Sequence, residues 1–235
     1  MLKNYLLSMY ASSTNDCNSK FLKLLEIDTD AFLLDCGCRD GASTLKFARR
    51  IRTRNIYGVD IDQETLKVAE KKGITAVCSN LNKKFPFKIG SFDVVTASQV
   101  VEHLYEVDNF VKEIHRVLKI GGYALISTEN LSSWDNVFAL ILGYQEFSNN
   151  FSREYRIGNP LTPGHLNKIK EPLLLHVKIP AYHSLKDIFW IHNFKVEKII
   201  GAGYHPFLGK MSSALSSVDS RHARFLIIKA RKLRH

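Results

Sequence analysis

Nine residues near the start of the chain, 33–41, have the sequence LLDCGCRDG. They predict the end of a buried strand, a glycine turn and the start of a helix. Gly37 and Gly41 have no Cβ, so a ligand can approach the main chain closely at both positions. In an open parallel sheet, ligands bind at such turns, beyond the carboxyl ends of the strands. This stretch therefore predicts an α/β fold with a ligand site at its first turn.

The spacing of this turn differs from that of two common nucleotide-binding loops. Gly37 and Gly41 form G-x-x-x-G rather than G-x-G-x-x-G, and no Lys-Ser or Lys-Thr pair follows to hold a phosphate and Mg²⁺. Asp35 stands before the first glycine, where a carboxylate would repel a pyrophosphate and would suit a cationic ligand. The alternative interpretation is a plain βα turn in which the glycines serve only the backbone geometry.

Strand and helix patterns alternate along most of the chain. We expect strands at residues 31–36, 55–60, 74–78, 92–97 and 123–127, and helices at 43–51, 63–72, 109–118 and 184–192. Residues 119–122 are expected to form the turn into the fifth strand. The last two strands, 194–203 and 223–230, have no convincing helical pattern of crossover length between them, which favours antiparallel pairing. The order predicts a Rossmann-like doubly wound sheet, mostly parallel, that ends in an antiparallel C-terminal hairpin.

The chain is expected to form a single domain over residues 1–235, with two additions to the alternating pattern. Residues 1–30 predict a helical lead-in, with Asn18 and Ser19 capping a helix over 20–25. Such a segment packs on the sheet edge or covers the ligand. Residues 129–182 depart from the alternation and predict an inserted cap or lid. Within them, residues 134–142 predict an apolar helix. Its favoured interpretation is part of the cap, followed by a dimer contact and then by a membrane-surface element.

Two acids follow the second expected strand and suit different roles. Asp60 ends that strand about twenty residues past Gly41, the spacing at which an acid meets the hydroxyls of a ribose. A carboxylate accepts hydrogen bonds from both hydroxyls of a vicinal diol. Asp62 is the better N-cap for the helix over 63–72. We therefore assign the diol to Asp60 and the cap to Asp62.

Four elements in this order resemble the class I S-adenosylmethionine-dependent methyltransferases, in their small-molecule branch. They are the D-C-G-C-R-D-G turn at 35–41, the acid Asp60, the S-Q-V-V-E-H-L stretch at 98–104 and the Gly-Gly turn in R-V-L-K-I-G-G at 116–122. The resemblance covers most of the chain and is strongest over 33–127. Ile120 stands where the family usually has proline, and Asn80 where it more often has Asp.

The resemblance implies an enzyme that uses S-adenosyl-L-methionine and releases S-adenosyl-L-homocysteine. It places Asn80 at the adenine amino group, Leu81 under the adenine ring, and the stretch from Ser98 beneath the methionine portion. The residues expected to bind the cofactor are Asp35, Gly37, Cys38, Gly41, Asp60, Ile61, Asn80, Leu81, Ser98, Gln99 and Val100.

The acceptor is expected to be a small or lipid-like molecule, with O-methylation favoured over N-methylation. A hydroxyl must lose its proton before it attacks a methyl group, which requires a base or a metal, whereas an amine needs only to be neutral. His103, after the fourth strand, and His165, at the border of the cap, are the candidate bases; a structural role is the alternative for each. No His or carboxylate cluster has metal-ligand spacing, and the Cys36-x-Cys38 pair has no second pair. No metal is therefore expected.

The net charge of +10 keeps other partners open. It suits a nucleic acid or an anionic membrane surface. No nucleic-acid recognition motif accompanies it, so a nucleic-acid substrate is not favoured. A nucleic-acid or protein methyltransferase and a non-catalytic S-adenosylmethionine-binding module are the alternative functions. A cytoplasmic location is expected, because no apolar run approaches the roughly 20 residues of a membrane span and no signal peptide is recognisable. The sequence leaves the oligomeric state open.

Overall fold

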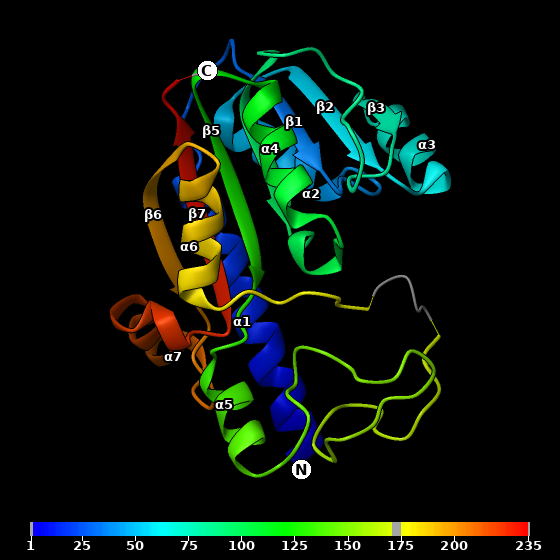
Figure 1. The fold of residues 1–235 in the computed structure, drawn as a ribbon, viewed down its shortest axis with the longest axis vertical. Helices are drawn as coiled ribbons and strands as arrows, with labels where there is room; N and C mark the ends of the chain where they lie inside the picture. Colours follow the sequence, from blue (N-terminus) through cyan, green and yellow to red (C-terminus); the bar gives the residue numbers. More distant parts are fainter. Residues whose placement is uncertain (1, 171–174, 235) are drawn as a thin grey trace.

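The computed structural model describes residues 2–170 and 175–234 and contains one seven-stranded sheet (Figure 1). The strand order is β3-β2-β1-β4-β5-β7-β6. The strands are β1 (Phe32–Cys36), β2 (Asn55–Asp60), β3 (Thr75–Cys78), β4 (Phe92–Ser98), β5 (Leu118–Glu129), β6 (Phe194–Ala202) and β7 (Phe225–Lys232). The pairs from β3 to β5 are parallel, whereas β7 is antiparallel to both of its neighbours. The predicted fold class is confirmed.

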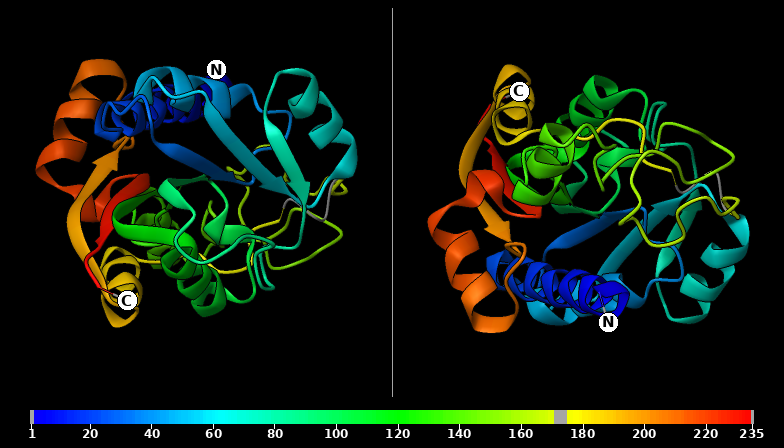
Figure 2. Two further views of the ribbon diagram at one scale, coloured as in Figure 1. Left: turned by 90° about the horizontal axis from the view of Figure 1, so that it is seen from above. Right: turned by 90° about the horizontal axis from the view of Figure 1, so that it is seen from below.

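Helices cover both faces of the sheet, as the doubly wound prediction requires. They are α1 (Leu2–Leu24), α2 (Ala42–Ile51), α3 (Gln63–Lys71), α4 (Val107–Val117), α5 (Trp134–Ile141), α6 (Tyr182–Ile191) and α7 (Gly209–Val218), with short 3₁₀ turns η1 (Val101–His103) and η3 (Ser220–His222). Figure 2 shows α1, α2 and α7 on one side of the sheet and α4 and α6 on the other. The sheet is therefore the middle of three layers.

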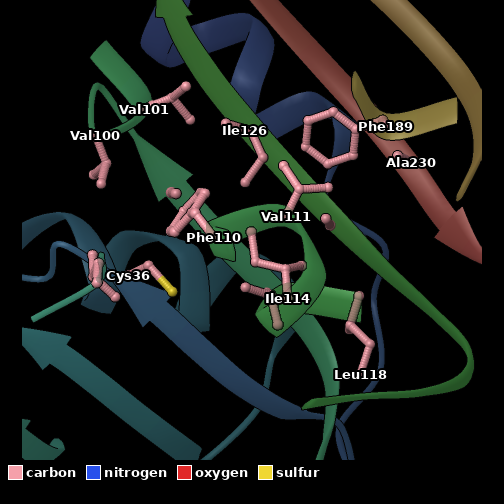
Figure 3. Close-up of a cluster of buried hydrophobic side chains, with 14 of the residues drawn as sticks. Cys36, Val100, Val101, Phe110, Val111, Ile114, Leu118, Ile126, Phe189 and Ala230 are labelled. Carbon is pink, nitrogen blue, oxygen red and sulfur yellow. The ribbon is translucent and has the colours of Figure 1, made fainter. Parts of the chain in front are cut away.

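The central strands β1, β4 and β5 are mostly buried on both faces, which divides the core into two clusters. Leu34 and Cys36 of β1 belong to the cluster under α4 and α6, and Leu33 between them belongs to the cluster under α1 and α2. This alternation follows from the two-residue period of a strand. Figure 3 shows Phe110 and Ile114 of α4 packed in the first cluster. Two-sided burial explains why the parallel strands are continuous apolar runs in the sequence.

The lead-in forms one long helix, so the predicted cap at Asn18 and Ser19 is wrong. α1 runs from Leu2 to Leu24. Its buried positions Met9, Ser13, Cys17 and Phe21 recur every four residues, which places them on one face. Ser13 and Cys17 are small and weaken the apolar pattern, which is why the sequence indicated only the last turns. The helix packs against β5, β6 and β7. No helix of the described residues is both long and apolar enough to cross a membrane.

The connection between β6 and β7 contains a helix that the sequence pattern concealed. α7 spans ten residues, and its buried face consists of Ser212 and Ser216. The Ser216 hydroxyl donates to the carbonyl oxygen of Ser213, and the Ser212 hydroxyl oxygen accepts from the backbone N–H of Tyr204 at 2.6 Å. A buried face of hydroxyls gives no apolar period. The antiparallel pairing of β6 and β7 is confirmed. The expectation that no helix lies between these strands is wrong.

The predicted turn at residues 119–122 is part of β5. The strand begins at Leu118, directly after α4, and extends to Glu129. Gly121 has φ 84°, and the register with β4 shifts between Phe92 and Val94. The two glycines therefore form an irregular start of a strand rather than a separate turn.

Basic side chains near the C-terminus are used inside the fold. Lys229 contacts Glu26 at 2.5 Å, and Lys232 donates to the carbonyl oxygens of His115 at 2.7 Å and Leu118 at 2.9 Å. Lys229, Lys232 and Arg224 are all buried. Much of the positive charge that the sequence concentrates in this region is therefore not available to an external polyanion.

Candidate functional site

The glycine turn lies at the switch point of the sheet, where β1 pairs with β2 on one side and β4 on the other. Gly37 has φ 75° and Gly41 has φ 77°. A Cβ on Gly37 would lie 2.5 Å from Cγ2 of Val100, and one on Gly41 would lie 2.2 Å from Cδ1 of Ile74. Both positions therefore require glycine, for backbone conformation and for space. The turn offers its main chain at the edge where open α/β sheets bind ligands.

Asp60 holds the glycine turn in place from the end of β2. Its buried carboxylate accepts from the backbone N–H of Arg39 at 2.9 Å and of Asp62 at 3.0 Å. An ionised carboxylate has about four acceptor sites, so capacity remains for a diol. Asp62 accepts from the N–H groups of Glu64 and Thr65 at the start of α3, which confirms the predicted cap.

Asp35 lies beneath the turn rather than in an open pocket. Its carboxylate accepts from the hydroxyls of Thr44 at 2.5 Å and Thr96 at 2.8 Å. Burial raises the pKa of Asp35 to about 6, although the two hydroxyls act in the opposite direction. The side chain thus ties β1 to α2 and β4. Its contact with a bound cofactor stays a prediction.

The adenine side of the predicted site has one exposed apolar residue. Ile61 directly follows Asp60 and exposes 66% of its surface. Leu81 is buried, and the side-chain oxygen of Asn80 accepts from the backbone N–H of Asn82 at 2.9 Å. The thiol of Cys38 is buried against Gly58, so only the backbone of Cys38 faces the turn. An apolar surface beside a buried acid suits a nucleoside, which has a flat ring and a ribose diol.

The methionine side of the predicted site is fixed to β5. Gln99 has φ 57°, and its backbone N–H donates to the carbonyl of Ser127 at 2.9 Å. The Gln99 amide donates to the Ser127 hydroxyl at 3.3 Å, and the Ser98 hydroxyl lies 3.0 Å from the same oxygen. Val100 packs beneath Gly37. The stretch from Ser98 to Val100 therefore lies between the glycine turn and β5.

A cavity of about 470 Å³ begins two residues farther along β5, at Glu129. One wall is the N-terminal half of α1, with Leu6, Leu7, Met9 and Tyr10. Another is the segment between β5 and α6, residues 130–181, called the cap segment below. Figure 1 shows this segment next to the N-terminal half of α1. The helix and the cap segment thus enclose a space beside the predicted cofactor site.

The base of the cavity is charged and internally paired. The buried Arg224 guanidinium lies 3.0 Å from Glu129 and 3.6 Å from Asp135, and it donates to the Ser148 hydroxyl at 2.5 Å. His205 Nδ1 lies 3.1 Å from Asp135. Burial alone would raise the pKa of Asp135, but Arg224 and His205 hold it well below its usual range. The cavity is therefore apolar along α1 and polar at its base.

The two candidate bases lie in different places. His103 is half-buried in η1, its Nδ1 is 3.2 Å from the carbonyl oxygen of Leu175, and burial lowers its pKa. His165 belongs to the cap segment, but it is not among the residues that line the cavity, whereas Thr162 and Pro163 are. His103 does not line the cavity either, but its backbone N–H donates to the carbonyl oxygen of Val100 at 3.0 Å, which places it next to the predicted cofactor residues.

Sequence reasoning missed two residues beside His103. His176 lines the cavity, and its ring centroid lies 5.0 Å from that of His103. Glu102 is fully buried, and burial together with the charge of Glu129 raises its pKa to about 8. His176 comes from the cap segment, far along the chain, so no local spacing indicated it. The only signal was the E-H pair in the S-Q-V-V-E-H-L stretch.

Comparison with known proteins identifies this arrangement. Residues 34–126 match a family model described as a methyltransferase domain. The chain is 32% identical over 130 residues to a demethylmenaquinone methyltransferase of Lactobacillus johnsonii, covering 51% of each protein. It is 26% identical over 214 residues to the mitochondrial ubiquinone biosynthesis O-methyltransferase of Rattus norvegicus, covering 86% of this chain and 53% of the rat protein.

A solved structure shows the same fold. An S-adenosylmethionine-dependent methyltransferase of Mesorhizobium loti superposes with a TM-score of 0.61 at 16% identity, covering 95% of this chain and all of that one. The chain spans about half the length of the curated relatives named above.

The fold is thus the one that this solved methyltransferase has, and the glycine turn lies at its switch point, between β1, β2 and β4. Residues 34–126 thus match a methyltransferase domain, and the chain is similar in sequence to S-adenosylmethionine-type methyltransferases over part of their length.

Proposed function

We propose that this protein transfers a methyl group from S-adenosylmethionine to a hydroxyl of a small, lipid-like acceptor. The observation that carries the proposal is the cavity of about 470 Å³, which has an apolar wall on α1 and a polar base at Glu129 and Arg224. Such a cavity suits a molecule with a polar head and an apolar tail. The relatives named for ubiquinone and menaquinone biosynthesis support this acceptor class.

The residues at the switch point fit the cofactor. Gly37 and Gly41 leave the turn without a Cβ, Asp60 would accept the ribose hydroxyls, and Ile61 would cover the adenine. Asn80 and Leu81 would meet the other side of the base. When bound, S-adenosylmethionine supplies a methyl group on a positively charged sulfur.

The protein then has to align the acceptor with that methyl group and exclude water. The turn from Ser98 to Val100 is bound to Ser127, and the cavity begins at Glu129 on the same strand. An acceptor head at the base of the cavity therefore lies next to the methionine side of the cofactor site. The cap segment and α1 cover the head, while Leu6 and Leu7 contact the tail.

Binding and turnover test the proposal in two stages. Calorimetric titration of the full chain should show binding of S-adenosylmethionine and S-adenosylhomocysteine and none of NAD. Dihydroxybenzoates with and without an alkyl chain, together with matched amines, then form the acceptor panel. We expect O-methylation, with kcat/KM at least tenfold higher for the alkylated phenol. No binding of either sulfur nucleotide, or methylation of amines alone, would overturn the proposal.

A pair of variants tests the apolar wall. Leu7 lines the cavity, whereas Ile141 is 71% exposed on α5 and is outside the lining. Leu7→Ser should remove most of the preference for the alkylated acceptor and leave kcat/KM for the short acceptor within about twofold, because one or two lost apolar contacts cost about 1–3 kcal/mol. Ile141→Ser should leave both values unchanged. Equal effects of the two substitutions would place the acceptor elsewhere.

A further inference from the structure

Three metal-ligand side chains lie close together beside the cavity, and one of them, His176, lines it. Glu102 and His103 are consecutive in η1, and His176 comes from the cap segment. One ligand atom of each lies within 4.8 Å of those of the other two. Among the residues that the structure describes, no other group of three His, Cys, Asp or Glu side chains meets this condition.

Both imidazoles are oriented so that one nitrogen is free to coordinate. His103 Nδ1 lies 3.2 Å from the carbonyl oxygen of Leu175, and His176 Nδ1 contacts the carbonyl oxygen of Ser148. A carbonyl can only accept, so each Nδ1 must carry the proton. The lone pair is then on Nε2 in both rings. Metal-binding histidines are held in this way, with the second nitrogen donating to a backbone carbonyl or a carboxylate.

The carboxylate of Glu102 lacks a partner on one oxygen. Its Oε2 accepts from the Thr128 hydroxyl at 3.0 Å, while its Oε1 is buried and has no hydrogen-bond partner. A buried carboxylate oxygen without a donor is costly, and each such group requires an explanation. Glu102 contributes one carboxylate oxygen to the cluster, so a cation bound there would lie beside this underused carboxylate.

We propose that Glu102, His103 and His176 bind a divalent transition-metal ion, with Zn²⁺ the best match. Two imidazoles and one carboxylate are a ligand set of catalytic zinc sites, in which a fourth position remains for water or substrate. Mg²⁺ and Ca²⁺ prefer oxygen ligands and fit this set poorly. This proposal differs from the expectation drawn from the sequence, in which no metal-ligand spacing was visible, because the third ligand comes from the distant cap segment.

The position of the ion gives it a role that rests on the proposed function. His176 lines the cavity, so an acceptor hydroxyl at its base can take the open coordination position. A metal-bound hydroxyl ionises far more readily than a free one, and its proton passes to solvent. The ion would therefore favour the oxygen nucleophile over the amine, which gains nothing from ionisation.

Metal binding can be measured without cofactor or acceptor. Full chain freed of metal with a chelator is titrated with Zn²⁺ by calorimetry and with Co²⁺ by visible absorption, with Mg²⁺ as the contrasting ion. We expect one Zn²⁺ per chain and no competition by Mg²⁺ at a hundredfold excess. Bound Co²⁺ should show the visible absorption bands that are typical of an ion with few ligands. His103→Asn and His176→Asn should each weaken Zn²⁺ binding at least a hundredfold.

His183→Asn is the matched control, because His183 is exposed on α6 and lies outside the cluster. It should bind Zn²⁺ like the wild-type chain. Zn²⁺ should also raise the unfolding temperature of the wild-type and His183→Asn proteins but not of His176→Asn, whose metal-free unfolding temperature checks that it folds. Equal Zn²⁺ affinity of the wild-type chain and the double variant of His103 and His176, or no binding by any of them, would overturn the site.

The two proposals fail in different ways. Methyl transfer that persists after chelation, in a chain that binds no Zn²⁺, would overturn the metal site and leave the proposed function standing. Specific Zn²⁺ binding by a chain that methylates nothing in the acceptor panel would overturn the proposed function and support the site.

Discussion

Asp60 and Asp62 are two residues apart but have different partners. Asp60 accepts from the glycine turn, and Asp62 accepts from the first turn of α3. Asp60→Ala should weaken S-adenosylmethionine binding more than tenfold, because it removes the acceptor for the ribose and the anchor of Arg39. Calorimetric titration measures the affinity, and circular dichroism checks that the variant folds.

Asp62→Ala is the control for Asp60→Ala. Loss of an N-cap costs about 1 kcal/mol of stability, and we expect cofactor affinity within twofold of the wild-type value. An unchanged affinity in Asp60→Ala would remove Asp60 from the ribose.

The buried carboxyl of Asp35 should make stability depend on pH. Its pKa is raised to about 6 in the folded chain, against about 3.9 in an unfolded one. The folded state therefore holds this proton more tightly, and the contribution of Asp35 to the free energy of unfolding falls as pH rises from about 4 to about 6, by roughly 3 kcal/mol. Asp35→Asn has no carboxyl group to titrate. In urea unfolding, the free energy of unfolding of this variant should therefore increase relative to that of the wild-type chain as pH rises over that range.

Asp40 provides the opposite case in the same turn. It is partly exposed, and its hydrogen bond from Lys72 lowers its pKa. As pH rises from acid values, the free energy of unfolding of Asp40→Asn should therefore fall relative to that of the wild-type chain. The fall should be slight, because the Asp40–Lys72 pair is solvated. A constant difference between Asp35→Asn and wild type across the range would contradict the burial effect.

At the scale of elements, the two halves of α1 differ in what they contact. Phe21, in the C-terminal half, is fully buried with its ring centroid 4.9 Å from that of Phe47. Leu7, in the N-terminal half, lines the cavity and is about half exposed. The same helix thus contributes to the core at one end and to the wall of the cavity at the other.

Phe21→Ala should lower the free energy of unfolding by about 3–5 kcal/mol, as expected for a large side chain removed from a packed core. Leu7→Ala should change it by less than about 0.5 kcal/mol. Urea unfolding of the two variants measures both values. Similar stability losses in the two would mean that α1 is packed along its whole length.

At the scale of the whole molecule, Arg224 joins parts that are far apart in the chain. From the start of β7 it reaches Glu129 at the end of β5, Asp135 in α5 and Ser148 in the cap segment. Removing it leaves the buried Glu129 and the partly buried Asp135 without their guanidinium partner. Arg224→Met should therefore cost about 3–5 kcal/mol of stability and expose the cap segment to proteolysis.

Arg221→Met is the matched change, because Arg221 is exposed and three residues away. It should alter stability by less than about 0.5 kcal/mol. Adding Glu129→Gln to Arg224→Met should recover part of the loss, since it removes one unpaired charge. Urea unfolding and limited proteolysis report the two effects. A stable, protease-resistant Arg224→Met variant would show that the network does not hold the cap segment.

The strands of the sheet and the helices α2, α3, α4 and α6 could be predicted from the sequence, whereas α1, α7 and the cavity could not. The strands and the glycine turn are strong local patterns. α1 and α7 were missed or shortened because their buried faces contain Ser13, Ser212 and Ser216. The base of the cavity and the Glu102–His103–His176 cluster are assembled from distant segments, so no local pattern could indicate them.

The cavity and the glycine turn are built from different parts of the chain, and this has a consequence for how such a protein can change. The family match at residues 34–126 ends within β5, before Glu129, while the cavity is lined by α1, the cap segment, His205 and Arg224. Substitutions in the lining can therefore alter the shape and charge of the cavity without touching the glycine turn at the switch point. Under the proposed function, the preferred acceptor can change while the residues proposed for the cofactor stay the same.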